Sequence, residues 1–334
     1  MTQTDAIFLI ILNWNGKKDT IQCLQSLQRV KYPKLTVVVV DNGSTDDSLQ
    51  EIKSSFPTVA LIENKKNLGF AEGNNVGIRY ALEHGADGVC LLNNDTVVDP
   101  LFIDAFAAAA SQHPKAGIFG AKIYLFDKRD HLDHLGGIWN PRRAAFDFVG
   151  LQALDDPHLY GKVQSLDYVC GAAFFVKREV FTTIGLLEPS FFLIWEEADF
   201  CSRARSAGYE ILSIPDAKIW HKGSASFIHK PHSTYFWWRN RLLWIERNCS
   251  QKEKTTLYKT VLIKEIFHIA KLKWIKSMEL FLFGFCFSES KQKKKKEKLL
   301  QYKAAWQGIT DFCKKKFDDA PSWIYKTSNT LIVK

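Results

Sequence analysis

Chemistry-bearing side chains stand at the end of an apolar run in the stretch Cys90-Leu-Leu-Asn-Asn-Asp95. Asn93, Asn94 and Asp95 supply two amides and one carboxylate directly after a run that is typical of a buried strand. Open α/β folds place their ligands at the carboxyl ends of their strands, and divalent cations bind oxygen ligands of this kind. The stretch therefore predicts a metal and nucleotide-diphosphate site.

A second group of acids follows the apolar run 191–195, where Glu196 and Glu197 are adjacent and Asp199 lies two residues on. Burial and like-charge repulsion would raise the pKa of one member of such a pair. A carboxylate tuned in this way can accept the proton of an attacking hydroxyl. The same three acids would also suit an exposed helix start stabilised by the helix dipole, and Asp199 alone would suit a turn cap.

These side chains need a scaffold that brings strand ends together. Strand, polar loop and helix recur three times from the N-terminus, and the run that ends at Asp95 is the fourth strand. This alternation predicts an α/β fold with a mostly parallel central sheet flanked by helices. In such a sheet one edge gathers the polar segments at 13–15, 41–47, 67–75 and 93–95.

Local signals place several helix starts. Ser44, followed three residues later by Asp47, resembles a capping box. Asp99 before Pro100 predicts an N-cap and a first helical turn.

The second half of the chain is less regular. The segment 127–165 is polar and weakly periodic, so we expect loops or a small β excursion near an acceptor site. Residues 168–176 are expected as one strand. His131 with His134, and His229 with His232, have HxxH spacing but no supporting acid motif, and loop positions are expected for them.

The basic charge is concentrated at the C-terminus. The formal charge of +9 comes from 45 basic and 36 acidic residues, of which 19 and 8 lie from Gln251 onward. That region is expected to be helical, and its lysines and aromatic residues suit a surface that docks on anionic lipid. A solvated helical face or a dimer contact would explain the lysine run 293–296 equally well. The aromatic residues concerned are Trp274, Phe281, Phe283, Phe285 and Phe287.

Other classes of protein are disfavoured. No recognised nucleic-acid module accompanies the basic run. The seven cysteines form no CxxC pair, which suits free thiols in a reducing cytosol. The apolar run 6–12 lacks a basic flank and is expected as a strand rather than a signal peptide. No apolar segment approaches the roughly 20 residues that span a bilayer.

Six motifs in order resemble those of family 2 glycosyltransferases with the nucleotide-sugar (GT-A) fold, especially the rhamnosyltransferase-like branch. The resemblance runs from about residue 7 to about residue 248. The motifs are Asn13-Trp-Asn15, Val40-Asp-Asn-Gly-Ser-Thr-Asp46, Asn67-Leu-Gly-Phe-Ala-Glu-Gly-Asn-Asn75, Asn93-Asn-Asp95, Trp195-Glu-Glu-Ala-Asp199 and Trp220-His221.

The resemblance implies a domain organisation. Residues 1–232 would form the GT-A catalytic domain, with a nucleotide-binding half at 1–100 and an acceptor half at 101–232. Residues 233–334 would form a basic, aromatic, helical C-terminal region.

The resemblance also implies roles for single residues. Asp95 and His221 would bind a divalent metal, Mg²⁺ or Mn²⁺, although Asn93 stands where the family usually has a first acid. Glu197 would be the catalytic base, with Glu196 as the alternative and Asp199 beside the acceptor. The residues expected to contact the nucleotide sugar are Asn13, Asn15, Asp41, Gly69, Phe70, Asn74, Asn94 and Arg239. Four of the residues named in this paragraph also have a purely structural interpretation: an Asx turn for Asp41, and packing for Phe70, His221 and Arg239.

The implied function is an inverting glycosyltransferase of polysaccharide biosynthesis in the cell envelope. It would move rhamnose from dTDP-rhamnose onto a lipid-linked or cell-surface polysaccharide acceptor. The expected location is cytoplasmic, peripheral on the inner face of the cell membrane, with a homodimer as one option. Alternatives are a UDP-hexose, UDP-N-acetylhexosamine or UDP-galactofuranose donor, a nucleotidyltransferase, or a non-catalytic carbohydrate-binding module.

Overall fold

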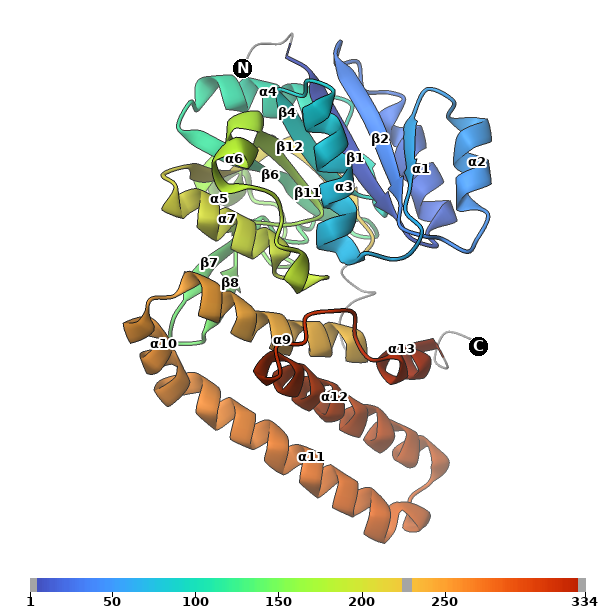
Figure 1. Ribbon diagram of the computed structural model, residues 1–334, viewed down its shortest axis with the longest axis vertical. Coiled ribbons are helices and arrows are strands. Elements are labelled where there is room, and N and C mark those ends of the chain that lie inside the picture. Colours follow the sequence, from blue (N-terminus) through green and yellow to red (C-terminus); the bar gives the residue numbers. More distant parts are fainter. Residues whose placement is uncertain (1–4, 224–229, 330–334) are drawn as a thin grey trace. The chain divides into compact units, whose positions relative to one another are not determined.

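The computed structural model describes residues 5–223 and 230–329 (Figure 1). His229 and the side chain of Phe285 lie outside the described part. The chain divides into two compact units. We call residues 1–139, 146–189 and 196–225 the sheet unit, and residues 140–145, 190–195 and 226–334 the helical unit.

A mixed, mostly parallel sheet forms the centre of the sheet unit. Within the described residues it has nine strands in the order β3-β2-β1-β4-β11-β6-β12-β5, with β9 paired to β12. Strands β1 to β4 are parallel neighbours, β6 is parallel to β12, and β11 is antiparallel to both β4 and β6. The strands are β1 Ile7–Asn13, β2 Leu35–Asp41, β3 Ala60–Glu63, β4 Gly88–Asn93, β5 Thr96–Val98, β6 Ala116–Leu125, β9 Gln164–Ser165, β11 Ala173–Lys177 and β12 Glu210–His221. The predicted α/β fold class is confirmed.

Helices cover both faces of this sheet. On β1, the residues Ile7, Leu9 and Ile11 belong to one buried core together with residues of α1 and α4. The alternate residues face α3, where a Cβ added at Gly77 would lie 2.6 Å from Ile10 Cγ2. Because β1 is buried on both faces, its sequence is a continuous apolar run. The helices are α1 Lys17–Leu27, α2 Ser48–Ser55, α3 Gly69–Glu83, α4 Phe102–Gln112, α5 Pro157–Tyr160, α6 Arg178–Ile184 and α7 Glu196–Ser206.

Strand register determines which polar residues meet at the sheet edge. Asn13 pairs with Asp41 across β1 and β2, and Leu12 pairs with Asn93 across β1 and β4. Three of the four predicted polar segments therefore leave adjacent parallel strands at the same end.

Three local expectations were wrong. Helix α2 begins at Ser48, and Ser44 instead accepts a hydrogen bond from the backbone N–H of Asn15, so it makes no capping box. The predicted N-cap at Asp99 is also wrong, because helix α4 begins at Phe102. Asp99 instead accepts a hydrogen bond from the backbone N–H of Leu101 in the turn before the helix.

The third correction concerns the segment 168–176. It divides at Gly171 into two strands in different sheets, β10 Tyr168–Val169 and β11 Ala173–Lys177. Strand β10 joins β7 Gly136–Asn140 and β8 Ala145–Phe148 in a three-stranded sheet, which is the small β excursion expected within 127–165.

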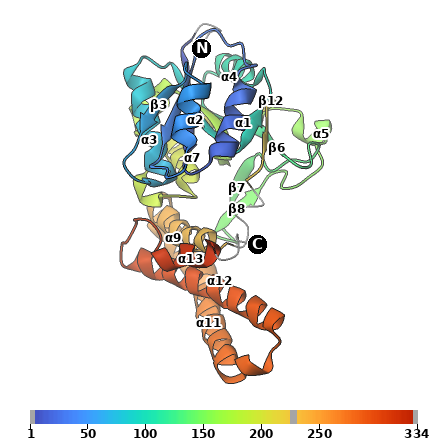
Figure 2. The same cartoon turned by 90° about the vertical axis from the view of Figure 1, so that its right-hand side faces the viewer.

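Helices dominate the helical unit (Figure 2). Helix α12 packs against both α9 and α11, and the lysine run 293–296 forms part of one continuous helix, α12. Within residues 5–223 and 230–329, no helix combines the length and the apolar character needed to cross a bilayer. The elements are the 3₁₀ turns η1 Pro189–Phe191 and η3 Gly284–Cys286, the π-helix η2 Tyr258–Leu262, α9 Pro231–Asn248, α10 Gln251–Leu257, α11 Ile263–Phe283, α12 Glu289–Cys313 and α13 Ser322–Asn329.

Candidate functional site

Asn13 and Asp41 form the centre of a buried polar network at the ends of β1 and β2. Asn13 Nδ2 donates to Asp41 Oδ1 at 2.7 Å and to Ser48 Oγ at 2.9 Å. The other oxygen of Asp41 accepts from the backbone N–H of Ser44 at 2.9 Å, which is the Asx turn anticipated from the sequence. One carboxylate oxygen thus binds the end of β1, and the other holds the loop that follows β2.

Asn15 binds the same loop from the other side. It has a positive φ of 51°, and its Oδ1 accepts from the backbone N–H groups of Thr45 at 2.7 Å and Asp46 at 3.2 Å. The predicted nucleotide-binding residues Asn13, Asn15 and Asp41 are therefore brought together. Their present contacts are with one another, with the loop that follows β2 and, through Asn13, with Thr20 of α1 and Ser48 of α2.

The start of α3 lies beside this network. Gly69 has a φ of 80°, which favours glycine, and its carbonyl accepts from Asn42 Nδ2 at 3.1 Å. Asn74 is buried and donates to the carbonyl of Phe70 at 2.9 Å. The predicted residues of this loop therefore cluster at the same sheet edge as Asp41.

Asp95 and His221 meet next to the end of β4. His221 Nε2 lies 3.2 Å from Asp95 Oδ1. Asp95 lies in the turn between β4 and β5, and His221 of β12 pairs with Thr96, the residue that follows Asp95. The sequence prediction that these two residues share a site agrees with this distance.

His221 also contacts Asp133, a residue that the sequence analysis did not select. Asp133 Oδ2 lies 2.8 Å from His221 Nδ1, on the opposite side of the ring from Asp95. Burial lowers the pKa of His221, but the hydrogen bonds and charges of Asp133 and Asp95 outweigh it and raise the pKa to about 9. At neutral pH the imidazole is protonated and lies between two carboxylates.

Two further features of this region are relevant to a cation. Asn93 Oδ1 is buried and receives no hydrogen bond from any residue that the structure describes. The backbone of Gly223 approaches the pair so closely that a Cβ there would clash with Asp95 and lie 2.7 Å from His221 Nε2. Asn94 points elsewhere, donating to Thr20 Oγ1 at 2.9 Å.

Glu196 and Glu197 differ in exposure although they are adjacent at the start of α7. Glu196 is buried, whereas Glu197 is partly exposed. Burial, and after it the charge of Glu197, raise the pKa of Glu196 well above its usual range. Asp199 is fully buried and accepts from Arg203 Nε at 2.8 Å.

The acid pair and the strand-end site lie around one buried turn. Burial raises the pKa of the Cys170 thiol, and the charges of Asp133, Glu197 and Asp95 raise it further. Two residues on, the carbonyl of Ala172 accepts a hydrogen bond from the N–H of Asn93, at the end of β4, at 2.9 Å. A Cβ at Gly171 would lie 3.6 Å from Glu197 Oε1. The two groups of acids found in the sequence thus converge in the folded chain.

Comparison with known proteins identifies the family. Residues 8–182, just over half of the chain, match the profile of glycosyl transferase family 2. The chain belongs to glycosyl transferase family 2. Its prediction as a glycosyltransferase is therefore confirmed.

Two relatives of this glycosyltransferase are rhamnosyltransferases by name. The N-acetylglucosaminyl-diphospho-decaprenol L-rhamnosyltransferase of Mycobacterium tuberculosis is 25% identical over 284 residues, covering 73% of this chain and 90% of the relative. The dTDP-rhamnosyl transferase RfbF of Shigella flexneri is 26% identical over 252 residues, covering 72% and 80%.

A solved structure confirms the GT-A fold. The mannosyltransferase PcManGT of Pyrobaculum calidifontis, in complex with GDP-Man and Mn²⁺, has a TM-score of 0.54 with this chain. The two are 15% identical, and the similarity covers 94% of this chain and 89% of the other.

Arg239 of this glycosyltransferase lies in the helical unit. It is fully buried in α9, and its guanidinium donates to the carbonyls of Phe191 at 2.8 Å and Ser190 at 3.2 Å. A third donor binds the carbonyl of Asp318 at 2.5 Å. These bonds give Arg239 a structural role, and a contact with a donor diphosphate would require it to exchange them.

The neighbouring Asn240 binds the same loop. Its Nδ2 donates to the carbonyls of Phe191 at 2.7 Å, Leu193 at 2.8 Å and Ile194 at 2.7 Å. Ile194 has a φ of 70°, and Phe192 and Trp195 also have positive φ values. The sequence analysis did not select Asn240, because its role depends on carbonyls almost 50 positions away.

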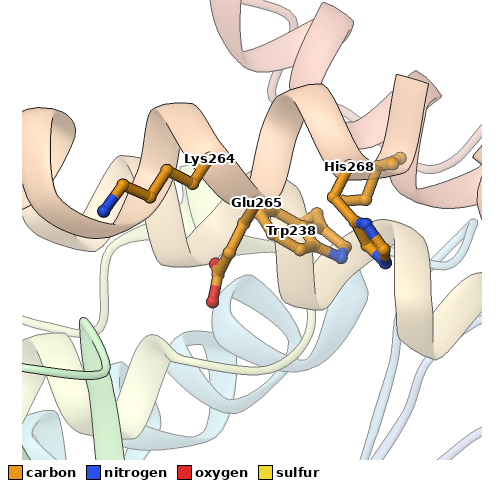
Figure 3. Close-up of a pocket in the computed structure, with 5 residues that line it drawn as sticks. Trp238, Lys264, Glu265 and His268 are labelled. Carbon is orange, nitrogen blue, oxygen red and sulfur yellow. The ribbon is translucent and has the colours of Figure 1, made fainter. Parts of the chain in front are cut away.

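The helical unit also has an open hollow of about 450 Å³ (Figure 3). Trp238 of α9 lines it together with Lys264, Glu265, His268 and Ile269 of α11. None of these five residues belongs to the predicted site.

Asp133 is the functional candidate that sequence reasoning missed. It lies inside the stretch His131-Leu-Asp-His134, for which only loop positions were expected. One sequence signal could have indicated it: Asp133 lies between the apolar residues Leu132 and Leu135, which the structure buries.

Proposed function

We propose that this glycosyltransferase is an inverting enzyme that moves rhamnose from dTDP-rhamnose to a lipid-linked or cell-surface polysaccharide acceptor. The observation that carries the proposal is that the turn 170–172 lies beside both groups of acids. A Cβ at Gly171 would lie 3.6 Å from Glu197 Oε1, and the carbonyl of Ala172 accepts a hydrogen bond at 2.9 Å from the N–H of Asn93, two residues before Asp95. This arrangement combines a strand-end acid suited to a donor complex with an acid pair, one member buried and the other partly exposed, that is suited to proton transfer. The names of the two bacterial relatives support rhamnose as the sugar.

The nucleotide is proposed to bind along the loop after β2 and the start of α3. The buried bond from Asn13 to Asp41 and the contacts of Asn15 fix this loop before a ligand arrives. A loop that is already ordered loses less conformational entropy on binding, which favours affinity. Gly69 and Asn74 lie in the first two turns of α3, and the carbonyl of Gly69 accepts from Asn42, the residue after Asp41.

The residues near Asp95 fit a divalent cation, Mg²⁺ or Mn²⁺. Within the described ranges no three His, Cys, Asp or Glu side chains are arranged to hold a metal by themselves. Asp95 and His221 would hold the ion together with oxygens of the donor diphosphate, and the amide oxygen of Asn93 is available nearby. When bound, such an ion neutralises charge that develops on the departing diphosphate. His221 would release its Nε2 proton on binding.

Glu197 is proposed as the catalytic base. Its partial exposure allows an acceptor hydroxyl to approach, whereas Glu196 is buried and its raised pKa favours the protonated form. Glu197 takes the hydroxyl proton while the acceptor oxygen bonds to the anomeric carbon. The bond from that carbon to the diphosphate oxygen breaks, and the nucleoside diphosphate leaves with the electron pair. A single displacement inverts the anomeric configuration.

A donor panel tests the sugar assignment. Calorimetric titration in the presence of Mn²⁺ would compare dTDP-rhamnose with UDP-hexose, UDP-N-acetylhexosamine and UDP-galactofuranose donors. We expect dTDP-rhamnose to bind at least about tenfold more tightly, a difference of about 1.4 kcal/mol. Preference for a UDP donor would replace the rhamnose assignment with that alternative.

The helical unit is proposed to dock on the inner face of the cell membrane. Phe267, Trp274 and Phe281 recur every seven positions along α11 and are 71%, 64% and 80% exposed. A spacing of seven residues returns to nearly the same side of a helix. The exposed Lys264 and Lys271 lie among them, so the helix combines aromatic groups with positive charge, as interfacial helices do. A second copy of the chain is the competing occupant of this surface.

A further inference from the structure

The His221 ring is held by a carboxylate from a distant part of the chain. Asp133 precedes His221 by 88 positions, and the 2.8 Å contact joins its Oδ2 to Nδ1. The exposed fractions of the two side chains are 6% for Asp133 and 10% for His221. Water therefore has little access to the pair, and the interaction is much less screened than a surface ion pair.

Asp133 is itself fixed by its backbone. Its N–H donates to the carbonyl of Ile123 in β6 at 2.8 Å, and its own carbonyl accepts from the N–H of Gln152 at 3.2 Å. His221 lies on β12, which pairs with β6. Asp133 is thus anchored to a strand that neighbours the strand of its histidine, and the pair has a rigid support.

The position of the carboxylate determines which ring nitrogen is available. A neutral imidazole carries one proton, and an acceptor at Nδ1 keeps that proton on Nδ1. The lone pair then lies on Nε2, which faces Asp95 at 3.2 Å. Histidine ligands of metals are commonly held by a carboxylate in this way.

We propose that Asp133 is a positioning residue that presents His221 Nε2, beside Asp95, to the divalent cation of the donor complex. The inference rests on the proposed function. It assigns the cation site a supporting residue outside the six sequence motifs.

A second aspartate–histidine pair in the same loop provides a matched control. Asp130 Oδ1 lies 2.8 Å from His131 Nδ1, the same distance as in the buried pair. Asp130 is 72% exposed, and the described residues place no second carboxylate within ion-pair distance of His131. Removing its charge tests the effect of losing an aspartate–histidine contact away from the site.

The experiment measures Mn²⁺ affinity of the full chain with saturating dTDP, by electron paramagnetic resonance of the free ion. We expect Asp133→Asn to weaken Mn²⁺ binding by on the order of 10- to 100-fold, and Asp130→Asn to leave it unchanged. In a His221→Gln background, Asp133→Asn should cause no further loss, because the aspartate acts through the histidine.

Three results would overturn the inference. They are full Mn²⁺ affinity in Asp133→Asn, an equal loss in Asp130→Asn, or an undiminished further loss in the His221→Gln background. Melting curves establish that each variant is folded at the assay temperature. Asp133→Glu is the second variant, since it retains an acceptor oxygen and should recover part of the affinity; no recovery would count against the inference.

Failure of the underlying site gives a different pattern. If Asp95→Ala and His221→Gln both bind Mn²⁺ as tightly as the unchanged protein, the proposed cation site is wrong and the inference falls with it. If these two lose binding while Asp133→Asn retains it, the site stands and only the role of Asp133 is refuted.

Discussion

Neighbouring acids in one sequence motif have different environments in this protein. Glu196 is 4% exposed and Glu197 is partly exposed, so only the second is open to an acceptor. Replacement of Glu197 by Gln removes the base but keeps the shape of the side chain. We expect turnover to fall by roughly 10²- to 10⁴-fold, the usual contribution of a general base, with donor affinity unchanged in calorimetry. If Glu196→Gln is the inactive variant and Glu197→Gln is active, the assignment is reversed.

The buried Glu196 also predicts a dependence of stability on pH. Its folded-state pKa is raised above the ordinary value of 4.5, so its contribution to stability is fully present below that pH and is lost as pH rises through the folded pKa. A glutamine does not titrate. We expect Glu196→Gln to melt at a higher temperature than the unchanged protein near pH 8, with the difference shrinking as pH falls toward 4.5. A difference that is the same at both pH values would contradict the burial argument.

Asp95 provides the test of metal dependence. It is the one carboxylate of its motif, because Asn93 occupies the other position. We expect Asp95→Ala to abolish transfer that depends on Mg²⁺ or Mn²⁺, measured as release of nucleoside diphosphate. Exposed Asp216, which lies on β12 five positions before His221, is a suitable control for replacement of an aspartate. Normal turnover in Asp95→Ala would refute the cation site.

At the scale of elements, Asn240 of α9 stabilises an unusual loop. Three non-glycine residues with positive φ lie within 192–195, and each such conformation is unfavourable in isolation. Removal of the amide leaves three carbonyls without this donor. We expect Asn240→Ala to lower the free energy of unfolding by on the order of 3 kcal/mol, measured by urea denaturation.

Asn248, on the same helix, is the control for this change. Its Nδ2 donates to the carbonyl of Trp244, one turn earlier in the same helix, at 3.1 Å. We expect Asn248→Ala to cost about 1 kcal/mol or less, since a hydrogen bond within one helix makes a modest net contribution. Similar losses for both variants would show that Asn240 has no special role in the loop.

The sequence was most informative where chemistry follows directly from local pattern. Continuous apolar runs identified β1, β2 and β4, and the parallel order then placed Asn13, Asp41 and Asn93 at one edge. The pairing of Asp95 with His221 was accessible through the family resemblance. These predictions required little knowledge of long-range packing.

Contacts between distant residues were beyond the sequence signals. The bond of Asp133 to His221 spans 88 positions, and no local periodicity indicates it. The predicted Ser44 capping box was wrong because the Ser44 hydroxyl accepts a hydrogen bond from the backbone N–H of Asn15, a residue that is distant in sequence. The break at Gly171 was missed because β10 and β11 are both apolar, although they belong to different sheets.

At the scale of the whole molecule, the charge is divided unevenly along the chain. The last 84 residues carry 19 basic and 8 acidic groups, whereas the preceding 250 carry 26 and 28. If the basic, aromatic surface on α11 docks on anionic lipid as proposed, each lysine near the membrane contributes about 1 kcal/mol. We expect Trp274→Glu in the full chain to reduce co-sedimentation with vesicles containing phosphatidylserine.

Leu159 supplies a control for this substitution. It belongs to the sheet unit and is 61% exposed, close to the 64% of Trp274. We expect Leu159→Glu to leave vesicle binding unchanged. Equal binding of all three proteins would refute the membrane role. If Trp274→Glu instead converts a dimer to a monomer in sedimentation velocity, the surface is occupied by a second copy.

The π-helix Tyr258–Leu262 changes the residue periodicity between α10 and the helix that carries this surface, α11. The N–H of Ile263 bonds to the carbonyl of Tyr258, five positions back instead of four. A seven-residue count started in α10 is therefore out of phase by one position when it reaches α11. Because the wider π turn absorbs one extra residue, deleting one residue from Tyr258–Leu262 would restore a continuous α-helix and leave the aromatic stripe facing nearly the same way.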